Sequence, residues 1–358
     1  MKKKQIIPAM LGGVIGGIAG YSGAKYFAGV GGNREMILPF IIVLAFSFFL
    51  HIIIHESGHL IFGLLSGYQF VSFRVGSLTL YKIKGKYKFG KYKLAGTGGQ
   101  CLMAPPEMKD GMIPYRLYNM GGAIMNLLFS VPTIMIWIMM RPTGFGKVFC
   151  VVWTIVGLFS AATNGIPMSM GQIDNDGKNA ISLGKNKKAL RAFWVQLKVN
   201  QMQVEGMSLI HMPEEWFELP ETEDMKNPMI AVLGALHCKR MMEEKRYEEV
   251  SQKIDQLLRS ETGMLGVHRI LLQIDQVFCE IMGSRNEKKL NLMNDKQVKQ
   301  FMKTMKNYPA ILRTQYAYAL HIEKDLNEAE KIKKRFERIM KTYPIQGELK
   351  TERQYIEM

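Results

Sequence analysis

Hydrophobic and polar positions divide the chain into two halves of different character. Long apolar runs fill the first half, whereas Lys, Glu, Arg and Gln dominate from about Lys185 onward. A helix that crosses a bilayer needs about 20 consecutive, mostly apolar residues. Four segments meet that need, at residues 5–24, 36–65, 115–140 and 147–169. The pattern therefore predicts a multi-pass α-helical membrane protein with a soluble C-terminal part.

The polar half repeats its apolar positions with the period of an α-helix, as in "YEEVSQKIDQLL". Tyr308-Pro309 and Tyr343-Pro344 are turn signals between such helices. Short helix pairs look like tetratricopeptide repeats, but their period is too irregular to count units. We expect a soluble all-α domain at residues 179–358, either tetratricopeptide-like or a small bundle. It shows no catalytic constellation, so we expect it to bind a protein partner or to gate the membrane part.

Residues 70–103 follow a different pattern, in which apolar or aromatic residues alternate with lysines around Gly85 and Gly90. Alternation with a period of two, interrupted by glycine, predicts strand, turn and strand. We therefore expect a small, membrane-associated β-hairpin element. One interpretation is an amphipathic hairpin that rests on anionic lipid.

Charge indicates how the membrane segments are oriented. The chain of 358 residues carries 47 Lys and Arg against 31 Asp and Glu, a formal net charge of +16. The loop after the second segment holds seven basic residues and no acid before Glu107. By the positive-inside rule this loop is cytoplasmic. Both termini and the soluble half then lie in the cytosol, in a protein integral to the cytoplasmic membrane.

Charge and cysteine content also argue against other classes. The basic residues fit membrane topology and attraction to a lipid bilayer, and no nucleic-acid-binding signature is apparent, so we expect no nucleic-acid partner. Four cysteines, none in a CxxC pair, argue against a disulfide framework or a cysteine zinc site. Residues 5–24 are compatible with a cleaved signal peptide, although their regularly spaced glycines suit close packing of membrane helices better.

Ionisable residues interrupt the second apolar segment in the stretch "HIIIHESGHL". His55, Glu56 and His59 form the pattern H-E-x-x-H, which places two imidazoles one helical turn apart on one face. Such a pair supplies two nitrogen ligands to zinc, and the adjacent carboxylate can take a proton from water. A chance match with packing histidines is the alternative, but ionisable groups in lipid are expensive without a function. We expect His51, on the same face, to make a polar contact rather than to bind metal.

A third ligand is expected from another helix. The fourth segment ends in "NGIPMSMGQIDNDGKNA", in which Pro167 breaks the helix and Asp174 and Asp176 follow. A broken helix at membrane depth is tolerated where it lines a polar cavity, so the chain can bend and return an aspartate toward the histidines. Taken alone, these residues also fit an ordinary turn at the membrane surface.

Together these motifs resemble the site-2 protease family of intramembrane zinc metalloproteases. That family combines H-E-x-x-H on one membrane helix with N-x-x-P and a later Asp-Gly, which Asn164-Gly165-Ile166-Pro167 and Asp176-Gly177 match. Its Gly-Pro-x-x-Asn element is similar to "GGAIMN" at residues 121–126, with Ala123 in place of proline. The resemblance covers residues 36–178.

The resemblance implies one zinc ion per chain, bound by His55, His59 and Asp176, with Glu56 as general base. Asp174 stays an alternative ligand, because the spacer after the proline is longer than in the family and an apolar residue precedes Asp174. We prefer Asp176, since the following glycine permits the tight turn that would re-aim its carboxylate.

The resemblance also implies a membrane-embedded peptide or protein as substrate, or a signal-peptide remnant. Asn164 and Asn126 are then candidates for substrate binding, and residues 70–103 would receive an extended substrate at a strand edge. The implied parts are an N-terminal helix and loop at 1–34, a metalloprotease core at 35–178 and a helical domain at 179–358.

Two function classes fit the sequence. One is an intramembrane zinc endopeptidase, and the other is a catalytically silent membrane adaptor whose helical domain binds a protein partner. Glu56 favours the enzyme, because a relic has no reason to keep a base between two histidines. A metal transporter is disfavoured, since the four apolar segments supply a single cluster of acid and histidine.

Overall fold

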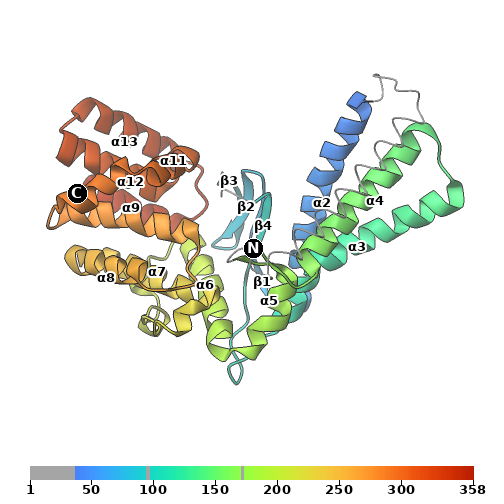
Figure 1. The fold of residues 1–358 in the computed structure, drawn as a ribbon, viewed down its shortest axis with the longest axis horizontal. Helices are drawn as coiled ribbons and strands as arrows, with labels where there is room; N and C mark the ends of the chain where they lie inside the picture. Colours follow the sequence, from blue (N-terminus) through green and yellow to red (C-terminus); the bar gives the residue numbers. More distant parts are fainter. Residues whose placement is uncertain (1–36, 94–96, 171–172) are drawn as a thin grey trace. The chain divides into compact units, whose positions relative to one another are not determined.

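The computed structural model describes residues 37–93, 97–170 and 173–358 (Figure 1). The chain forms two compact units. Of the described residues, the first unit combines 37–69 with those of 106–186, and the second combines those of 70–105 with 187–358. Most of the described residues are helical, and a small antiparallel sheet accompanies the helices.

Three long helices dominate the first unit: α2 (Ile37–Leu65), α3 (Tyr115–Met140) and α4 (Gly144–Gly165). They contact one another in all three pairings (Figure 1). Each is long and apolar enough to cross a bilayer. Three of the four predicted spans are thereby confirmed as candidate membrane-spanning helices, and the remaining one, at residues 5–24, lies outside the described residues.

Glycines bring α2 and α3 into backbone contact. A Cβ atom added at Gly58 would lie 2.2 Å from the carbonyl oxygen of Gly121, and one added at Gly122 would lie 2.4 Å from the His55 ring. Both distances are far shorter than van der Waals contact, so a side chain at either position would push the helices apart. Small residues on facing helices are what permits such close packing.

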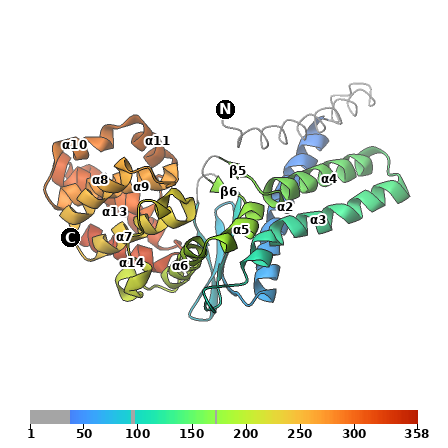
Figure 2. The same cartoon turned by 60° about the horizontal axis from the view of Figure 1, so that its bottom comes forward.

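The chain reverses direction after α4. This helix ends at Gly165, because Ile166 is extended, as residues before a proline usually are. Strands β5 (Ser169–Met170) and β6 (Ile173–Asp174) then pair antiparallel, and α5 (Asp176–Ser182) follows directly. Figure 2 shows β5, β6 and α5 grouped at the end of α4. The predicted break at Pro167 is confirmed, although the helix ends four residues before the predicted boundary at 169.

The second unit contains a four-stranded sheet. Its strands are β1 (Gln69–Val75), β2 (Leu78–Ile83), β3 (Lys86–Lys91) and β4 (Gly99–Ala104), in the order β3-β2-β1-β4. Lys84 and Gly85 form a two-residue hairpin turn with φ of 47° and 76°. The predicted turn at Gly85 is confirmed. Gly90 instead lies inside β3, where its missing side chain leaves room for the carbonyl of Thr342.

The sheet packs against helices of its own unit. Val71, Tyr81 and Ala104 share a buried apolar cluster with Val204, the last residue of α6 (Lys187–Val204). The strands therefore belong to the same compact unit as the C-terminal helices. The alternating pattern indicates which face of a strand is apolar, but not which partner covers that face. The division at residues 34 and 178 concerns function and stays a prediction.

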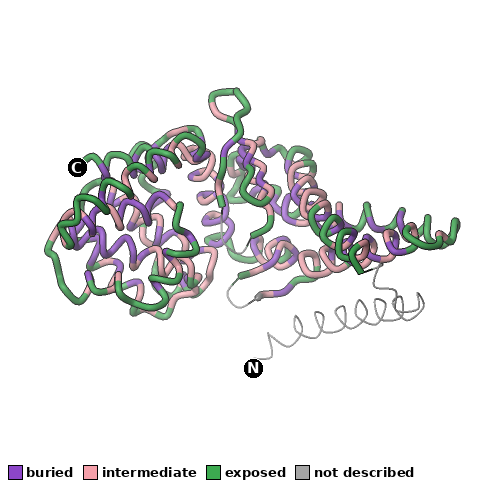
Figure 3. The backbone as a smooth tube through the Cα atoms, turned by 90° about the horizontal axis from the view of Figure 1, so that it is seen from above, coloured by how far each residue is buried: buried purple, intermediate pink, exposed green. Residues whose placement is uncertain are grey.

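Residues 187–358 are built from helices. After α6 come α7 (Pro228–Glu243), α8 (Tyr247–Arg259), α9 (Gly266–Met282), α10 (Glu287–Leu290), α11 (Lys296–Thr304), α12 (Pro309–Tyr318), α13 (Leu326–Met340) and α14 (Gln346–Glu357). Pro309 begins α12 and Pro344 lies between α13 and α14, so both predicted turns are confirmed. Buried residues follow the inner sides of these helices (Figure 3). Whether they form tetratricopeptide-like repeats or a bundle stays a prediction.

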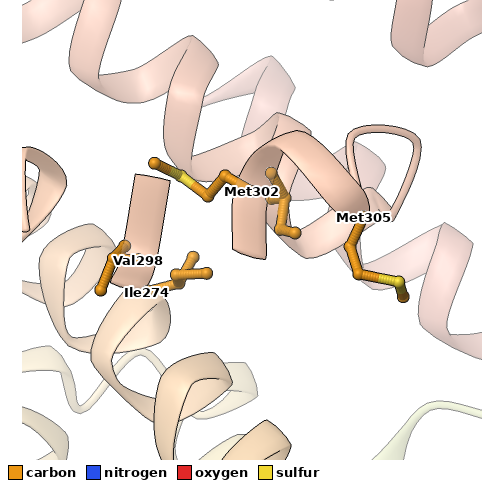
Figure 4. Packing of buried hydrophobic residues seen from close by; sticks show 5 residues of the cluster. Ile274, Val298, Met302 and Met305 are labelled. Carbon is orange, nitrogen blue, oxygen red and sulfur yellow. The ribbon is translucent and has the colours of Figure 1, made fainter. Parts of the chain in front are cut away.

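Two apolar clusters fill the interior of this helical part. Figure 4 shows the first, in which Ile274 of α9 lies near Val298 and Met302 of α11 and near Met305. The second contains Phe336 of α13, which is fully buried. Its other members are Leu312, Tyr343, Leu349 and Ile356. Burial of such side chains is the main favourable contribution to the stability of a helical domain of this size.

We expect Gly58→Ala to lower the unfolding temperature of the purified protein in detergent. Overpacking usually costs about 1–3 kcal/mol, and the atom that the new methyl group meets is backbone, which cannot rotate away. Gly266→Ala is the control, since nothing lies within 4 Å of a Cβ atom there. Equal unfolding temperatures for the two variants would contradict the close crossing of α2 and α3.

Candidate metal centre

Two histidines of α2 and one aspartate of α5 converge in the first unit. Nε2 of His55 lies 3.2 Å from Oδ2 of Asp176 and 3.2 Å from Nε2 of His59. Nε2 of His59 lies 3.4 Å from the same carboxylate oxygen. Within the described parts of the chain, no other group of three His, Cys, Asp or Glu side chains lies close enough to share a metal ion.

Backbone and side-chain contacts orient both imidazoles. Nδ1 of His59 donates a hydrogen bond to the carbonyl oxygen of Tyr118 at 2.8 Å. A neutral imidazole that carries its proton at Nδ1 has its lone pair on Nε2. The carbonyl of α3 thus selects the tautomer of His59 whose Nε2 can bind a metal ion.

Asn126 of α3 lies between His51 and His55. Its Nδ2 donates to Nδ1 of His55, and its Oδ1 accepts from Nδ1 of His51, both at 3.3 Å. Asn126 and His51 are almost completely buried. The expected polar contact of His51 is confirmed, because its partner belongs to a neighbouring helix and the ring lies outside the three-residue cluster.

Asn175 holds the first turn of α5 in place, a role that was not predicted from the sequence. Its side chain makes four hydrogen bonds to backbone groups on both sides of the chain reversal, those of Thr163, Ile166, Met168 and Lys178. They tie the end of α4 to the start of α5 and so fix the position of Asp176. A signal was present, because asparagine directly before a helix is a favoured N-cap.

Gly177 is required for a reason that differs from the expected one. The expected role was a tight turn that re-aims the Asp176 carboxylate. In the structure Gly177 is a helical residue of α5, and a Cβ atom there would lie 2.1 Å from the carbonyl oxygen of Gly165. The glycine therefore allows α5 to approach the end of α4, which brings Asp176 within reach of the histidines.

The remaining predicted residues lie in other positions. Asp174 accepts a hydrogen bond from Ser169 and lies 3.7 Å from Nζ of Lys178, so its carboxylate is outside the cluster. Asn164 occupies the last turn of α4, is partly exposed, and donates to the carbonyl oxygen of Ser160 at 2.9 Å. Glu56 follows His55 in α2 and is 9% exposed.

The charge state of Asp176 suits a metal ligand. Burial alone would raise the pKa of Asp176, but His55 and His59 in their protonated form donate to its carboxylate and hold that pKa well below its ordinary value; metal binding displaces those protons. Its carboxylate is therefore ionised at neutral pH and acts as an acceptor. Two imidazole nitrogens and a carboxylate oxygen form the kind of set that binds catalytic zinc with one position open.

The spacing of the donor atoms also fits zinc. Tetrahedral zinc with bonds of about 2.0–2.1 Å places neighbouring ligand atoms about 3.3–3.4 Å apart. The three separations here are 3.2, 3.2 and 3.4 Å. The donor set is therefore compatible with one zinc ion held by two residues of α2 and one of α5.

Apolar helices long enough to span a bilayer, with a His, His and Asp cluster among them, define a membrane protein with a candidate metal centre. The family model of peptidase family M50 matches residues 42–344, which is most of the chain. The chain therefore belongs to peptidase family M50, the site-2 protease family of membrane metalloproteases, and the resemblance found in its motifs is confirmed. No curated protein and no solved structure matches the chain.

We expect the purified protein to bind about one zinc ion per chain. Asp176→Asn should weaken binding, because an amide is a poor zinc ligand and leaves the positive charge less compensated. Asp174→Asn is the matched control and should retain zinc, since that carboxylate contacts Ser169 and Lys178. Metal analysis after dialysis measures both. A reversed pattern would assign the ligand to Asp174, and unchanged zinc in a His55→Ala, His59→Ala double variant would refute the site.

Proposed function

We propose that the chain is an intramembrane zinc endopeptidase that hydrolyses a peptide bond of a membrane-embedded substrate or a signal-peptide remnant. The observation that carries the proposal is the convergence of two imidazole nitrogens and one carboxylate oxygen, with Glu56 directly following His55. Membership of peptidase family M50, which implies a metallopeptidase, supports it independently.

Hydrolysis adds water across the amide bond and requires a proton to move. When bound, zinc supplies Lewis acidity, which polarises a peptide carbonyl and makes a water molecule more acidic. Glu56 accepts a proton from the attacking water on a carboxylate oxygen and passes it to the amide nitrogen as the C–N bond breaks. Its burial in α2 keeps bulk water from competing for that proton.

The polar residues of α3 act by orienting the ligands. Histidines that bind metal through Nε2 carry a proton on Nδ1, which needs an acceptor. For His59 that acceptor is the Tyr118 carbonyl. For His55 that acceptor is the side-chain amide of Asn126. This requires the amide to be rotated by 180° from the orientation described above, so that Oδ1 accepts from Nδ1 of His55 and Nδ2 donates to Nδ1 of His51. We therefore assign Asn126 to positioning His55 rather than to substrate binding, and we keep Asn164, which is partly exposed, as the candidate for substrate contact.

An extended substrate could reach the protein through the sheet. A helical backbone has its carbonyls in hydrogen bonds, so a membrane helix must unwind before a peptide bond can be attacked. β3 and β4 are the outermost strands of the four-stranded sheet. An outermost strand can pair with an extended peptide, which supports a role for this sheet in presenting the substrate.

We expect a reporter fused after residue 178 to be cytoplasmic. The lysines of residues 82–93 place the loop after α2 inside, and the two candidate spans α3 and α4 return the chain to that side. Protease protection in intact cells is the measurement, with a fusion in residues 141–144 as the outward-facing control. Accessibility of residue 200 from outside would contradict the orientation.

We expect Glu56→Gln to abolish cleavage while zinc stays bound. The substitution keeps the shape of the side chain and all three proposed ligands but removes the proton acceptor, so the rate should fall by a factor of about 100 or more. Ser57→Ala, at the next position of the motif, is the matched control and should cleave normally. Peptides released from membranes of cells with each variant report the result. Cleavage at the wild-type rate by Glu56→Gln would contradict the proposed mechanism and favour a catalytically silent membrane adaptor.

A further inference from the structure

The helical part of the second unit contains a pocket lined by charged side chains. Its cavity volume is about 30 Å³, enough for a group the size of one or two water molecules. Two basic and four acidic residues from α7, α9, α12 and α14 line it, namely Lys239, Arg313, Glu243, Asp275, Glu348 and Glu352. All of them belong to one compact unit. The lining therefore carries two more acids than bases.

Arg313 compensates part of this negative charge. It is 2% exposed, and its guanidinium donates to Oδ1 of Asp275 at 2.6 Å and to Oε1 of Glu352 at 3.1 Å. Glu352 uses one carboxylate oxygen in this way. Its second oxygen, Oε2, is buried and has no hydrogen-bond partner among the described residues.

Glu348 and Glu243 accept hydrogen bonds from neutral donors, and Glu348 also lies near one cation. Glu348 accepts from the hydroxyls of Tyr308 and Tyr343 at 2.8 and 2.7 Å, and Lys239 lies 3.8 Å from it. Glu243 accepts from Thr351 Oγ1 at 3.0 Å. Neutral donors stabilise a carboxylate without cancelling its charge. When Glu352 is ionised, the lining therefore carries two more negative than positive charges.

A second polar atom in the pocket also lacks a partner. The hydroxyl of Tyr355 is buried and makes no hydrogen bond within the described parts of the chain. Tyr355 and Glu352 are 7% and 5% exposed, and both line the cavity. A buried acceptor without a donor costs about 1–3 kcal/mol, more when it is charged. A positively charged group with several N–H donors can donate to both oxygens.

The titration of Glu352 agrees with this geometry. Burial raises the pKa of Glu352 to about 7; Arg313 opposes the shift, whereas Glu348 and Asp275 add to it. A folded-state pKa above the ordinary value means that stability is lost as the pH rises toward 7 and the carboxyl ionises. A cation bound beside the ionised carboxylate offsets that loss.

The acceptor atoms that line the pocket indicate the kind of cation. A bare metal ion needs several oxygen ligands around one point, and within the described residues the acids of this pocket do not form such a group. A guanidinium presents its donors as a rigid planar fork that suits the two oxygens of one carboxylate, whereas an ammonium is a compact charge with three donors that can reach acceptors of two different residues. Leu209 and Met242, which also line the pocket, provide an apolar surface for an attached alkyl chain.

We propose that this pocket binds a primary ammonium group, carried by a lysine side chain of a peptide segment or by a small polyamine. Oε2 of Glu352 and the hydroxyl oxygen of Tyr355 accept its hydrogen bonds. The site is separate from the candidate metal centre and does not depend on proteolytic activity. The helical part would therefore bind a class of ligand that differs from the metal ion of the first unit.

Calorimetric titration of the full chain in detergent tests the proposal. The probes are the peptide Ac-Ala-Ala-Lys-Ala-Ala-NH2, the same peptide with Nε-acetyl-lysine, and spermidine. We expect saturable binding of the lysine peptide or of spermidine at about one site per chain, and none of the acetylated peptide. Binding of the peptide alone identifies a protein ligand, and binding of spermidine alone identifies a polyamine.

Three variants locate the binding. Glu352→Gln and Tyr355→Phe should each weaken it at least tenfold, whereas Glu249→Gln, which removes an exposed acid of α8, should not change it. Tyr355→Phe should also keep the wild-type unfolding temperature, since the hydroxyl has no partner to lose. Binding should be about tenfold tighter at pH 8 than at pH 6, as Glu352 ionises. No binding of either probe, or binding that neither pocket variant weakens, would overturn the proposal.

Discussion

A polar side chain inside an apolar helix bundle must find its hydrogen-bond partners within the protein, because lipid offers none. Three histidines of α2 need such partners, and α3 provides one for each of them. His59 donates to the carbonyl of Tyr118, while Asn126 contacts both His51 and His55. Such bonds require the two helices to approach closely, and the missing side chains of Gly58, Gly121 and Gly122 allow it. The orientation of the imidazoles therefore depends on the close approach of α2 and α3 at these glycines. If the helices moved apart, the hydrogen bonds that orient the imidazoles would be lost.

A regular helix could not supply the third donor. Asp176 reaches the histidines because α4 stops before Pro167, the chain reverses through β5 and β6, and α5 begins beside the end of α4. Each step leaves backbone groups without helical partners, and Asn175 satisfies four of them. Irregular backbone near membrane depth is tolerated only with such internal compensation. The position of the carboxylate thus depends on a neutral neighbour that makes no contact with the histidines.

Features that depend on local sequence could be predicted, and features that depend on distant partners could not. The three long helices follow from uninterrupted apolar runs, and the break at Pro167 follows from the chemistry of one residue. Asp176 was preferred over Asp174 because of Gly177, but the glycine serves a contact with Gly165 rather than a turn. The association of the sheet with α6 and the amide shared by His51 and His55 join residues more than 70 positions apart. No periodicity in the sequence carries that information.

The candidate metal centre and the charged pocket of the helical part both present acceptor atoms to a cation, but they differ in geometry. Each contains atoms that can accept a hydrogen bond or bind a metal: two imidazole nitrogens and a carboxylate in the first unit, and a carboxylate oxygen and a hydroxyl oxygen in the second. At the membrane site the three acceptors lie within 3.4 Å of one another, which is the spacing around a single small ion of high charge. In the helical pocket Arg313 bridges Asp275 and Glu352, and two tyrosine hydroxyls donate to Glu348. A singly charged donor with directed hydrogen bonds suits that arrangement, since its attraction does not require the acids to converge.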